Sequence, residues 1–210
     1  MTALLLAGAL LACEENLDPA TPDGALHKLR NAVTKKDAPA ILESCSAQTL
    51  ASLKELHTLL TGQAQTINQT YPEEHRIAAR ASYPAGLLDA KSPEALFNVL
   101  LEGGLKDLNA SPGLSFGMTA QGHPSIDGQH ASVTSQAGEA YEFVLEGGAW
   151  KSTAFEREIS GAINHARLHQ QTMDENLKVI GELRRIEQRR LARDAAAAPS
   201  APSAPATAGH

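Results

Sequence analysis

Three turn signals at ten-residue intervals constrain the fold of this chain more than any other feature of its sequence. They are Asp127-Gly128, Ala137-Gly138 and Gly147-Gly148. Asp-Gly and Gly-Gly are favoured in two-residue hairpin turns, because those turns need positive φ angles. Between the last two signals, Tyr141, Phe143 and Leu145 alternate onto one face of a strand. The pattern predicts a four-stranded antiparallel meander with strands near 114–122, 129–136, 139–146 and 149–156.

Apolar residues at spacings of three and four predict helices before the meander. A helix capped by Thr21 is expected to end at 35–37, and a short helix follows over 38–42. A third helix, capped by Ser46, carries a stripe of leucines and is expected to run to about Ile67. The first half of the chain is therefore predicted to be mainly helical.

The stretch from 71 to 105 is predicted to be less regular. Proline follows tyrosine at 71–72 and again at 83–84, and we expect an irregular segment between these two places. Ser92-Pro93 is predicted to start a middle helix that is buried on much of its surface. Gly103-Gly104 is expected to end that helix, because glycine is common just past helix C-termini.

A long amphipathic helix is predicted after the meander. We expect an α+β domain over 21–156 and the helix over 157–194, with an apolar stripe from Ile159 to Ile180. The stripe fades beyond Ile180, so the last turns are predicted to project into solvent. The tail 195–210 is rich in Ala, Pro and Ser, cannot build a core, and is predicted to be disordered.

The N-terminal segment ends in a cysteine that predicts a cellular location. Eleven of the twelve residues before Cys13 are apolar or glycine, a run too short to cross a bilayer but typical of a signal peptide. Residues 10–13, Leu-Leu-Ala-Cys, resemble the lipobox of bacterial lipoproteins. The resemblance implies a signal peptide over 1–12, acylation of Cys13 at the mature N-terminus, and a tether over 13–20.

Two features depart from the lipobox pattern. No Lys or Arg precedes the apolar run, so we expect translation to begin upstream of Met1, and Leu11 is bulkier than usual. The alternative is an ordinary secretory signal cut near Ala12, which would leave Cys13 as a free thiol. With the lipobox, the protein is predicted to lie in the bacterial cell envelope, lipid-anchored to a membrane and either facing the periplasm or on the outer membrane.

Cys45 is then left without a cysteine to pair with. It falls in 41–50, which is predicted to be helical, and we expect a buried cysteine that behaves as a small apolar side chain. A catalytic thiol needs an adjacent base, and no histidine is placed beside Cys45 by the sequence. A Cys13–Cys45 disulfide is the alternative if the lipobox interpretation is wrong.

The histidines are the main candidates for metal binding. His165 and His169 are four residues apart, so they share a helix face and could hold a metal together. A third ligand at useful spacing and an HExxH motif are missing, which favours a solvated pair. His123 and His130 flank the Asp127-Gly128 turn and are expected at the surface. The sequence contains no Walker-type or GxGxxG motif, and no metal or cofactor is predicted.

The charge distribution disfavours one class of partner. The net charge is −6, so a nucleic-acid partner is not expected. The exception is 184–193, which carries five Arg and one Glu. Cations near a helix C-terminus complement the helix dipole, so helix stabilisation is the main interpretation. Attraction to anionic lipid head groups is the alternative.

Helices followed by a curved antiparallel meander resemble the NTF2-like superfamily, whose domains form an α+β cone. Residues 21–26 resemble the first helix of small NTF2-like lipoproteins, and 141–144 with 148–151 resemble their last hairpin. Enzymes of that superfamily place a carboxylate and a Tyr or His inside the cone. The resemblance therefore makes candidates of Tyr141, Glu142 and Asp127. Asp127 is better explained by its turn and Tyr141 by packing, so no catalytic set is predicted.

The sequence thus predicts a non-catalytic, membrane-anchored lipoprotein that scaffolds or binds a partner. We expect a protein partner or self-association through 159–180. One alternative is a periplasmic carrier that binds a small apolar ligand in the cone. A second is an isomerase- or hydrolase-like enzyme, which requires a carboxylate inside the cone.

Overall fold

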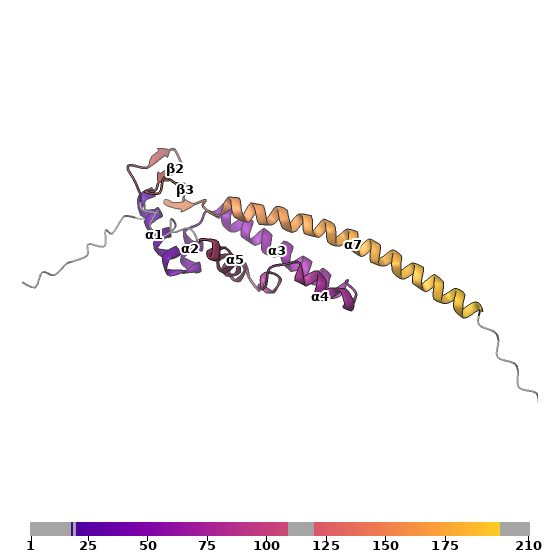
Figure 1. The fold of residues 1–210 in the computed structure, drawn as a ribbon. Helices are drawn as coiled ribbons and strands as arrows, with labels where there is room; N and C mark the ends of the chain where they lie inside the picture. The colour runs from indigo at the N-terminus through magenta and orange to yellow at the C-terminus, as the bar shows by residue number, and fades with distance from the viewer. Residues whose placement is uncertain (1–17, 19, 109–119, 198–210) are drawn as a thin grey trace, which may run out of the picture.

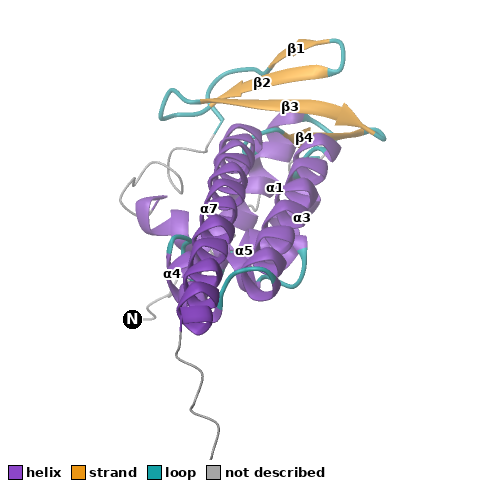
Figure 2. Ribbon diagram, turned by 90° about the vertical axis from the view of Figure 1, so that its right-hand side faces the viewer, coloured by secondary structure: helices purple, strands orange, loops and turns teal. Residues whose placement is uncertain are grey.

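The computed structural model describes residues 18, 20–108 and 120–197. It has the predicted α+β fold, in which helices form an elongated bundle and a small antiparallel sheet lies across one end (Figures 1 and 2). The predicted signal peptide 1–12, Cys13 and residues 198–210 of the predicted tail lie outside the described residues. Among the helices that are described, none has both the length and the apolar character needed to cross a bilayer.

The first and third helices begin at the predicted caps, Thr21 and Ser46, and the second begins at the predicted residue, Ala38, with Asp37 as its cap. The three helices are α1 (Pro22–Lys35), α2 (Ala38–Ser44) and α3 (Ala47–Gln69). The Thr21 hydroxyl accepts a hydrogen bond from the backbone N–H of Gly24, and Ser46 does the same for Thr49. Lys36 ends α1 in a left-handed conformation with φ 55°. Side chains of three caps, including Asp37 at α2, thus satisfy donors that a helix leaves free at its start.

Two predictions for the stretch from 71 to 105 are wrong. The segment between the Tyr-Pro pairs contains a helix, α4 (Glu73–Ala81), because Pro72 sits just before the first turn, where proline is tolerated. The middle helix, α5 (Pro93–Leu108), continues through Gly103-Gly104. A glycine inside a helix costs about 1 kcal/mol relative to alanine, which weakens a helix without ending it.

The burial predicted for the middle helix is also too extensive. Only Leu96 and Phe97 of α5 are buried among the residues whose side chains are described. A short 3₁₀ helix, η1 (Leu87–Asp89), lies between α4 and α5 and packs against α3. The stretch from η1 to α5 therefore packs against α3 through one face of α5 and through the short η1 helix.

The predicted meander is present, with its strands in chain order. The strands are β1 (Ser125–Asp127), β2 (His130–Thr134), β3 (Ala140–Glu146) and β4 (Ala149–Ser152). The first strand was expected at 114–122 but lies at 125–127. The reason is that the turn is only two residues long, so the residues directly on either side of the turn, Asp127 and His130, pair with each other. Ala120 makes only an isolated bridge to Ser135, and 114–119 lies outside the described residues. The fourth strand ends at Ser152 because the next helix begins soon afterwards.

The turns differ in length more than the signals predict. Gly147-Gly148 forms a two-residue turn with both φ angles positive, at 59° and 83°. The first turn consists of Gly128 and Gln129, one residue later than the Asp-Gly signal. Thr134 pairs with Ala140, so 135–139 forms a longer loop around Gly138. Glycine therefore marks each turn, while the strand register sets the turn's length.

The last helix, α7 (Glu156–Ala197), is 42 residues long and lies along α3. Its buried side chains follow the predicted stripe: Ile159, Ile163, Ala166 and Met173. Residues 195–197, expected in the disordered tail, belong to the helix. Every residue of 182–197 is exposed, as the fading stripe predicted, and this part of α7 extends beyond the other helices (Figure 1).

One main core joins the sheet to the helices. The inner face of the sheet contributes Ala131, Val133, Tyr141, Phe143 and Trp150. These side chains lie in one cluster with buried residues of α1, α2, α3, α5 and the start of α7. A second cluster of Ile67, Tyr71 and Met173 holds the end of α3 against the middle of α7, with Leu177 and Ile180 at its edge. Packing along α7 therefore stops near Ile180.

Candidate functional site

The inner face of the sheet is the first place to look for a binding site, and helix side chains pack against it. Val133 and Phe143 are at most 2% exposed and belong to the main core. α1 contacts β2 and β4, and α2 contacts β4. The face that would line a cone is thus occupied by the protein's own apolar side chains.

The three residues suggested by the NTF2-like resemblance do not come together in one site. Tyr141 is buried on the inner face, and its hydroxyl donates a hydrogen bond to Oε2 of Glu139 at 2.9 Å. Burial, together with the neighbouring Glu139 carboxylate, raises the pKa of Tyr141. Glu142 is exposed on the opposite face of β3, and Asp127 is exposed beside its turn. This arrangement matches packing for Tyr141 and a turn role for Asp127.

Cys45 is buried, as predicted, but it follows α2 instead of lying within a helix. Its thiol donates to the carbonyl oxygen of Ile41 at 3.3 Å, and its backbone bridges to Ser152 of β4. Burial raises the pKa of the thiol to about 12, with Lys151 lowering it and Glu156 raising it to smaller extents. Because the thiolate is the reactive form, the thiol is inert near neutral pH.

The histidine pair forms a ring contact on the side of α7. The ring centroids of His165 and His169 are 4.8 Å apart, and His169 also lies 4.9 Å from Tyr83. Across residues 20–108 and 120–197, no group of three His, Cys, Asp or Glu side chains is arranged to hold a metal ion. His123 and His130 are exposed, as expected for residues beside a turn. The pair is accounted for by packing beside Tyr83.

A buried polar cluster, which sequence reasoning missed, joins the start of α3 to the start of α7. Oε1 of Glu156 accepts hydrogen bonds from the hydroxyls of Ser46 at 2.8 Å and Thr49 at 3.3 Å. The Glu146 carboxylate accepts the backbone N–H of Ala47 through both oxygens, at 3.1 and 3.0 Å. Two carboxylates thus face the positive end of the α3 dipole, which is a stabilising arrangement. Of these contacts, the Ser46 cap is the one that neighbouring residues in the sequence could have indicated.

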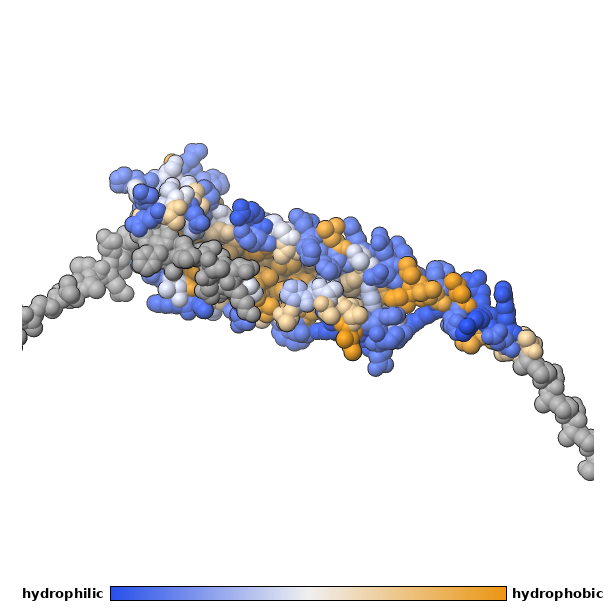
Figure 3. Space-filling model, viewed as in Figure 1, coloured by the Kyte–Doolittle hydropathy of each residue, from blue (hydrophilic) through white to orange (hydrophobic). Residues whose placement is uncertain are grey.

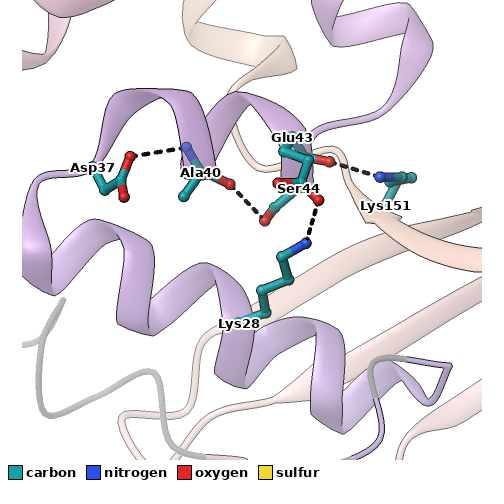
Figure 4. A network of polar contacts seen from close by, with 6 residues as sticks. All are labelled: Lys28, Asp37, Ala40, Glu43, Ser44 and Lys151. Carbon is teal, nitrogen blue, oxygen red and sulfur yellow. Dashed lines mark hydrogen bonds and ion pairs between the residues drawn. The ribbon is translucent and has the colours of Figure 1, made fainter.

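A second polar network ties α1 and α2 to β4 (Figure 4). Nζ of Lys28 lies 2.7 Å from Oε1 of Glu43, and Nζ of Lys151 donates to the Glu43 backbone carbonyl at 2.6 Å. The hydrogen bond and charge of Lys28 lower the pKa of Glu43. All three side chains lie at the surface, so this network positions elements and offers no enclosed site.

The remaining candidate is the exposed surface of α7 from Val179 onwards. Its exposed large apolar residues, here called the distal α7 surface, are Val179, Leu183, Ile186 and Leu191, which are 55–60% exposed. Val179, Leu183 and Ile186 follow one another at spacings of four and three, so they share a helix face. Figure 3 shows apolar residues gathered on this projecting part of α7. Exposed apolar stripes of this kind mark interaction surfaces.

Arginine and glutamate side chains surround that apolar stripe. Arg185 pairs with Glu182 at 2.5 Å, and Arg190 pairs with Glu187 at 2.8 Å, each three residues apart along the helix. Such exposed pairs contribute about 0.2–0.5 kcal/mol each to a helix. They stabilise the projecting helix without covering its apolar residues, so the distal α7 surface is available to a partner.

None of the protein-family models, curated proteins or solved structures with which the chain was compared matches it. The lipobox and NTF2-like resemblances therefore stay predictions from the sequence, and Cys13 lies outside the described residues.

Proposed function

We propose that this protein is a non-catalytic scaffold of the bacterial cell envelope, anchored to a membrane through lipid on Cys13, that binds a protein partner through the distal α7 surface. The observation that carries the proposal is the exposure of 182–197 on all sides, with apolar residues along it. A helix gains most of its stability in proteins from packing of an apolar face, and this part of α7 has no such packing.

The proposed partner surface differs from the one that the sequence predicted. The stripe that was first expected to mediate association is largely buried in the protein's own core. Its buried residues are Ile159, Ile163, Ala166 and Met173. The apolar residues that remain for a partner lie further along, from Val179 to Leu191. This placement supports contact through the end of the helix.

The two ends of the molecule suit a scaffold. The N-terminal end of α1 and the tip of α7 lie at opposite ends (Figure 1). At 1.5 Å per residue, the 42 residues of α7 span about 63 Å. The proposed tether 13–20 adds at most about 28 Å of reach. A protein held at Cys13 would therefore present the distal α7 surface far from its anchored end.

A carrier or enzyme function is supported less well. Either function requires open space beside the inner face of the sheet, where Val133, Tyr141 and Phe143 instead join the main core. An enzyme would also need Glu142 or Asp127 beside Tyr141, and both carboxylates are exposed elsewhere.

Site-specific photo-crosslinking in intact cells tests the partner surface. A photoreactive residue replacing Leu183 is expected to give discrete adducts, whereas the same residue replacing Leu168 is expected to give none. The two leucines are matched because both lie on α7 and both are 60% exposed. Equal crosslinking at the two positions, or none at either, would contradict the proposal.

The anchor is tested separately. Cys13→Ser is expected to move the protein from the membrane fraction to the soluble fraction and to abolish incorporation of a labelled fatty acid. Cys45→Ser serves as the control, because the Cys45 thiol is buried. Unchanged fatty-acid incorporation in Cys13→Ser would refute lipidation at Cys13.

A further inference from the structure

We propose that the partner of the distal α7 surface is a second copy of this chain, bound antiparallel along the last helix. This inference rests on the proposed function, since it names the partner that the exposed helix binds. The reasons are the position of the apolar stripe, the charges beside it, and the length of helix left uncovered.

The apolar stripe sits between two different polar ends of the same helix face. Val179, Leu183 and Ile186 form its centre. Continuing with the same spacing, Asn176 lies on the N-terminal side, and Arg190 and Arg193 lie on the C-terminal side. In the heptad notation abcdefg, Leu183 and Arg190 occupy position a. Position d is occupied by Val179, Ile186 and Arg193.

Charges exclude the parallel arrangement of two such helices. Parallel pairing would place Arg190 against Arg190 of the other copy, and Arg193 against Arg193. It would also bring Glu182 at a g position beside Glu187 at the following e position. Like charges placed directly opposite each other are destabilising. Two parallel copies would therefore repel one another in four pairs, since the Glu182–Glu187 contact occurs twice by symmetry.

The antiparallel arrangement resolves these repulsions. With Leu183 opposite Ile186 of the second copy, Arg190 meets Val179 and Arg193 meets Asn176, so the arginines no longer face each other. In the same register, Glu182 lies beside Arg189 of the second copy, and this attraction occurs twice by symmetry. The charges and the apolar stripe thus favour one register.

The length of the contact sets its expected strength. This register overlaps residues 172–197 of the two copies, about 39 Å of helix at 1.5 Å per residue and about 10 Å wide. That strip covers about 400 Å² per copy, roughly half of the 800 Å² that a standard interface buries on each partner. We therefore expect a weak dimer, with a dissociation constant in the micromolar range. Anchoring to one membrane would raise the effective concentration of the two copies.

Charge reversal tests the register. Sedimentation velocity of the full chain over a range of micromolar concentrations is expected to show a monomer–dimer equilibrium. Glu182→Arg and Arg189→Glu should each weaken dimerisation about tenfold, and the double variant should restore it to within about threefold of the original. Arg157→Glu is the matched control, because Arg157 is on α7 but outside the overlap and its side chain is 93% exposed.

Disulfide trapping tests the orientation independently. A chain with Glu182→Cys mixed with a chain carrying Arg189→Cys should form a mixed disulfide, while neither chain should crosslink to itself. Circular dichroism of each variant confirms that α7 remains helical, so a loss of dimer is not a loss of fold.

Any result other than those expected above overturns the proposed antiparallel dimer. A monomer at all concentrations, or a dimer insensitive to both charge reversals, refutes it. If the chain is monomeric but Leu183 still crosslinks to a different protein, the scaffold function stands and only the self-association fails. Arginine-dependent binding of the monomer to phosphatidylglycerol vesicles would instead assign the surface to anionic lipid.

Discussion

Replacing Glu156 should destabilise the fold more than its position near the surface suggests. Its Oε1 accepts hydrogen bonds from the hydroxyls of Ser46 and Thr49, which are 1% and 0% exposed. Glu156→Ala removes this acceptor from two buried donors. Glu156→Gln keeps an oxygen in place but removes the charge beside the start of α3.

The expected magnitude follows from these contacts. A hydrogen bond to a charged group contributes about 1.5–3 kcal/mol, and a carboxylate near a helix N-terminus contributes a further 0.3–1 kcal/mol. Ser46 and Thr49 also lie 2.9 Å from each other, so one donor keeps a partner after the change. We expect Glu156→Ala to lower the free energy of unfolding by about 2–3 kcal/mol, and Glu156→Gln by about 1 kcal/mol.

Urea unfolding followed by circular dichroism measures these changes. The midpoint is expected to fall while the m-value stays constant, because the surface exposed on unfolding is unchanged. Glu158→Gln is the control, since Glu158 is also in the first turn of α7 but its carboxylate pairs with the exposed Arg157. The reasoning is refuted if Glu156→Ala stays within about 0.5 kcal/mol of the original protein, or if Glu158→Gln is equally destabilising.

Burial and exposure lead to four further predictions. Cys45 should resist iodoacetamide at pH 8 in the folded protein and react fully in urea, as mass spectrometry would show; rapid native labelling would contradict its burial. Because its folded pKa is raised from 9.0 to about 12, Cys45 stabilises the fold below pH 9 and loses this contribution as the pH rises to about 12, so stability should fall less steeply with pH in Cys45→Ala. Phe143→Ala should cost about 3–5 kcal/mol by urea unfolding, since Phe143 is 2% exposed in the main core, whereas Ile126→Ala, at 56% exposure, should cost under 1 kcal/mol. Deleting 182–210 should leave the melting temperature of the dilute protein within about 3 °C, because 182–197 makes no core contact; a larger drop would show that the distal helix supports the fold.

Local signals predicted the elements whose cause is local. The predicted caps Thr21 and Ser46 accept hydrogen bonds from residues three positions ahead, so a short window contains the whole interaction. Glycine at 147–148 permits the positive φ angles of a two-residue turn for the same reason. The middle helix was wrongly expected to end at Gly103-Gly104. A short window of sequence does not distinguish a glycine at the end of a helix from a glycine inside one.

Long-range contacts could not be predicted from such windows. The hydrogen bond between Ser46 and Glu156 joins residues 110 positions apart, and Tyr71 reaches the Met173 carbonyl across 102 positions. The boundary between buried and exposed parts of α7 depends on where α3 ends, and this is why we propose the distal residues, and not 159–180, as the partner surface. The lipobox interpretation of Cys13 depends on the sequence alone and stays a prediction.

By itself, the sequence determined the order of the strands and of the helices other than α4, the turn positions to within a residue or two, and the fading of the apolar stripe on the last helix. Each of these depends on backbone preferences and residue spacing within about ten positions. Only the tertiary structure decided that α7 buries its apolar stripe within the protein itself, that the inner face of the sheet is filled, and that Glu156 bonds Ser46 and Thr49. The reason is that burial depends on which helices and strands pack against each other, and this packing involves residues that are distant in the chain.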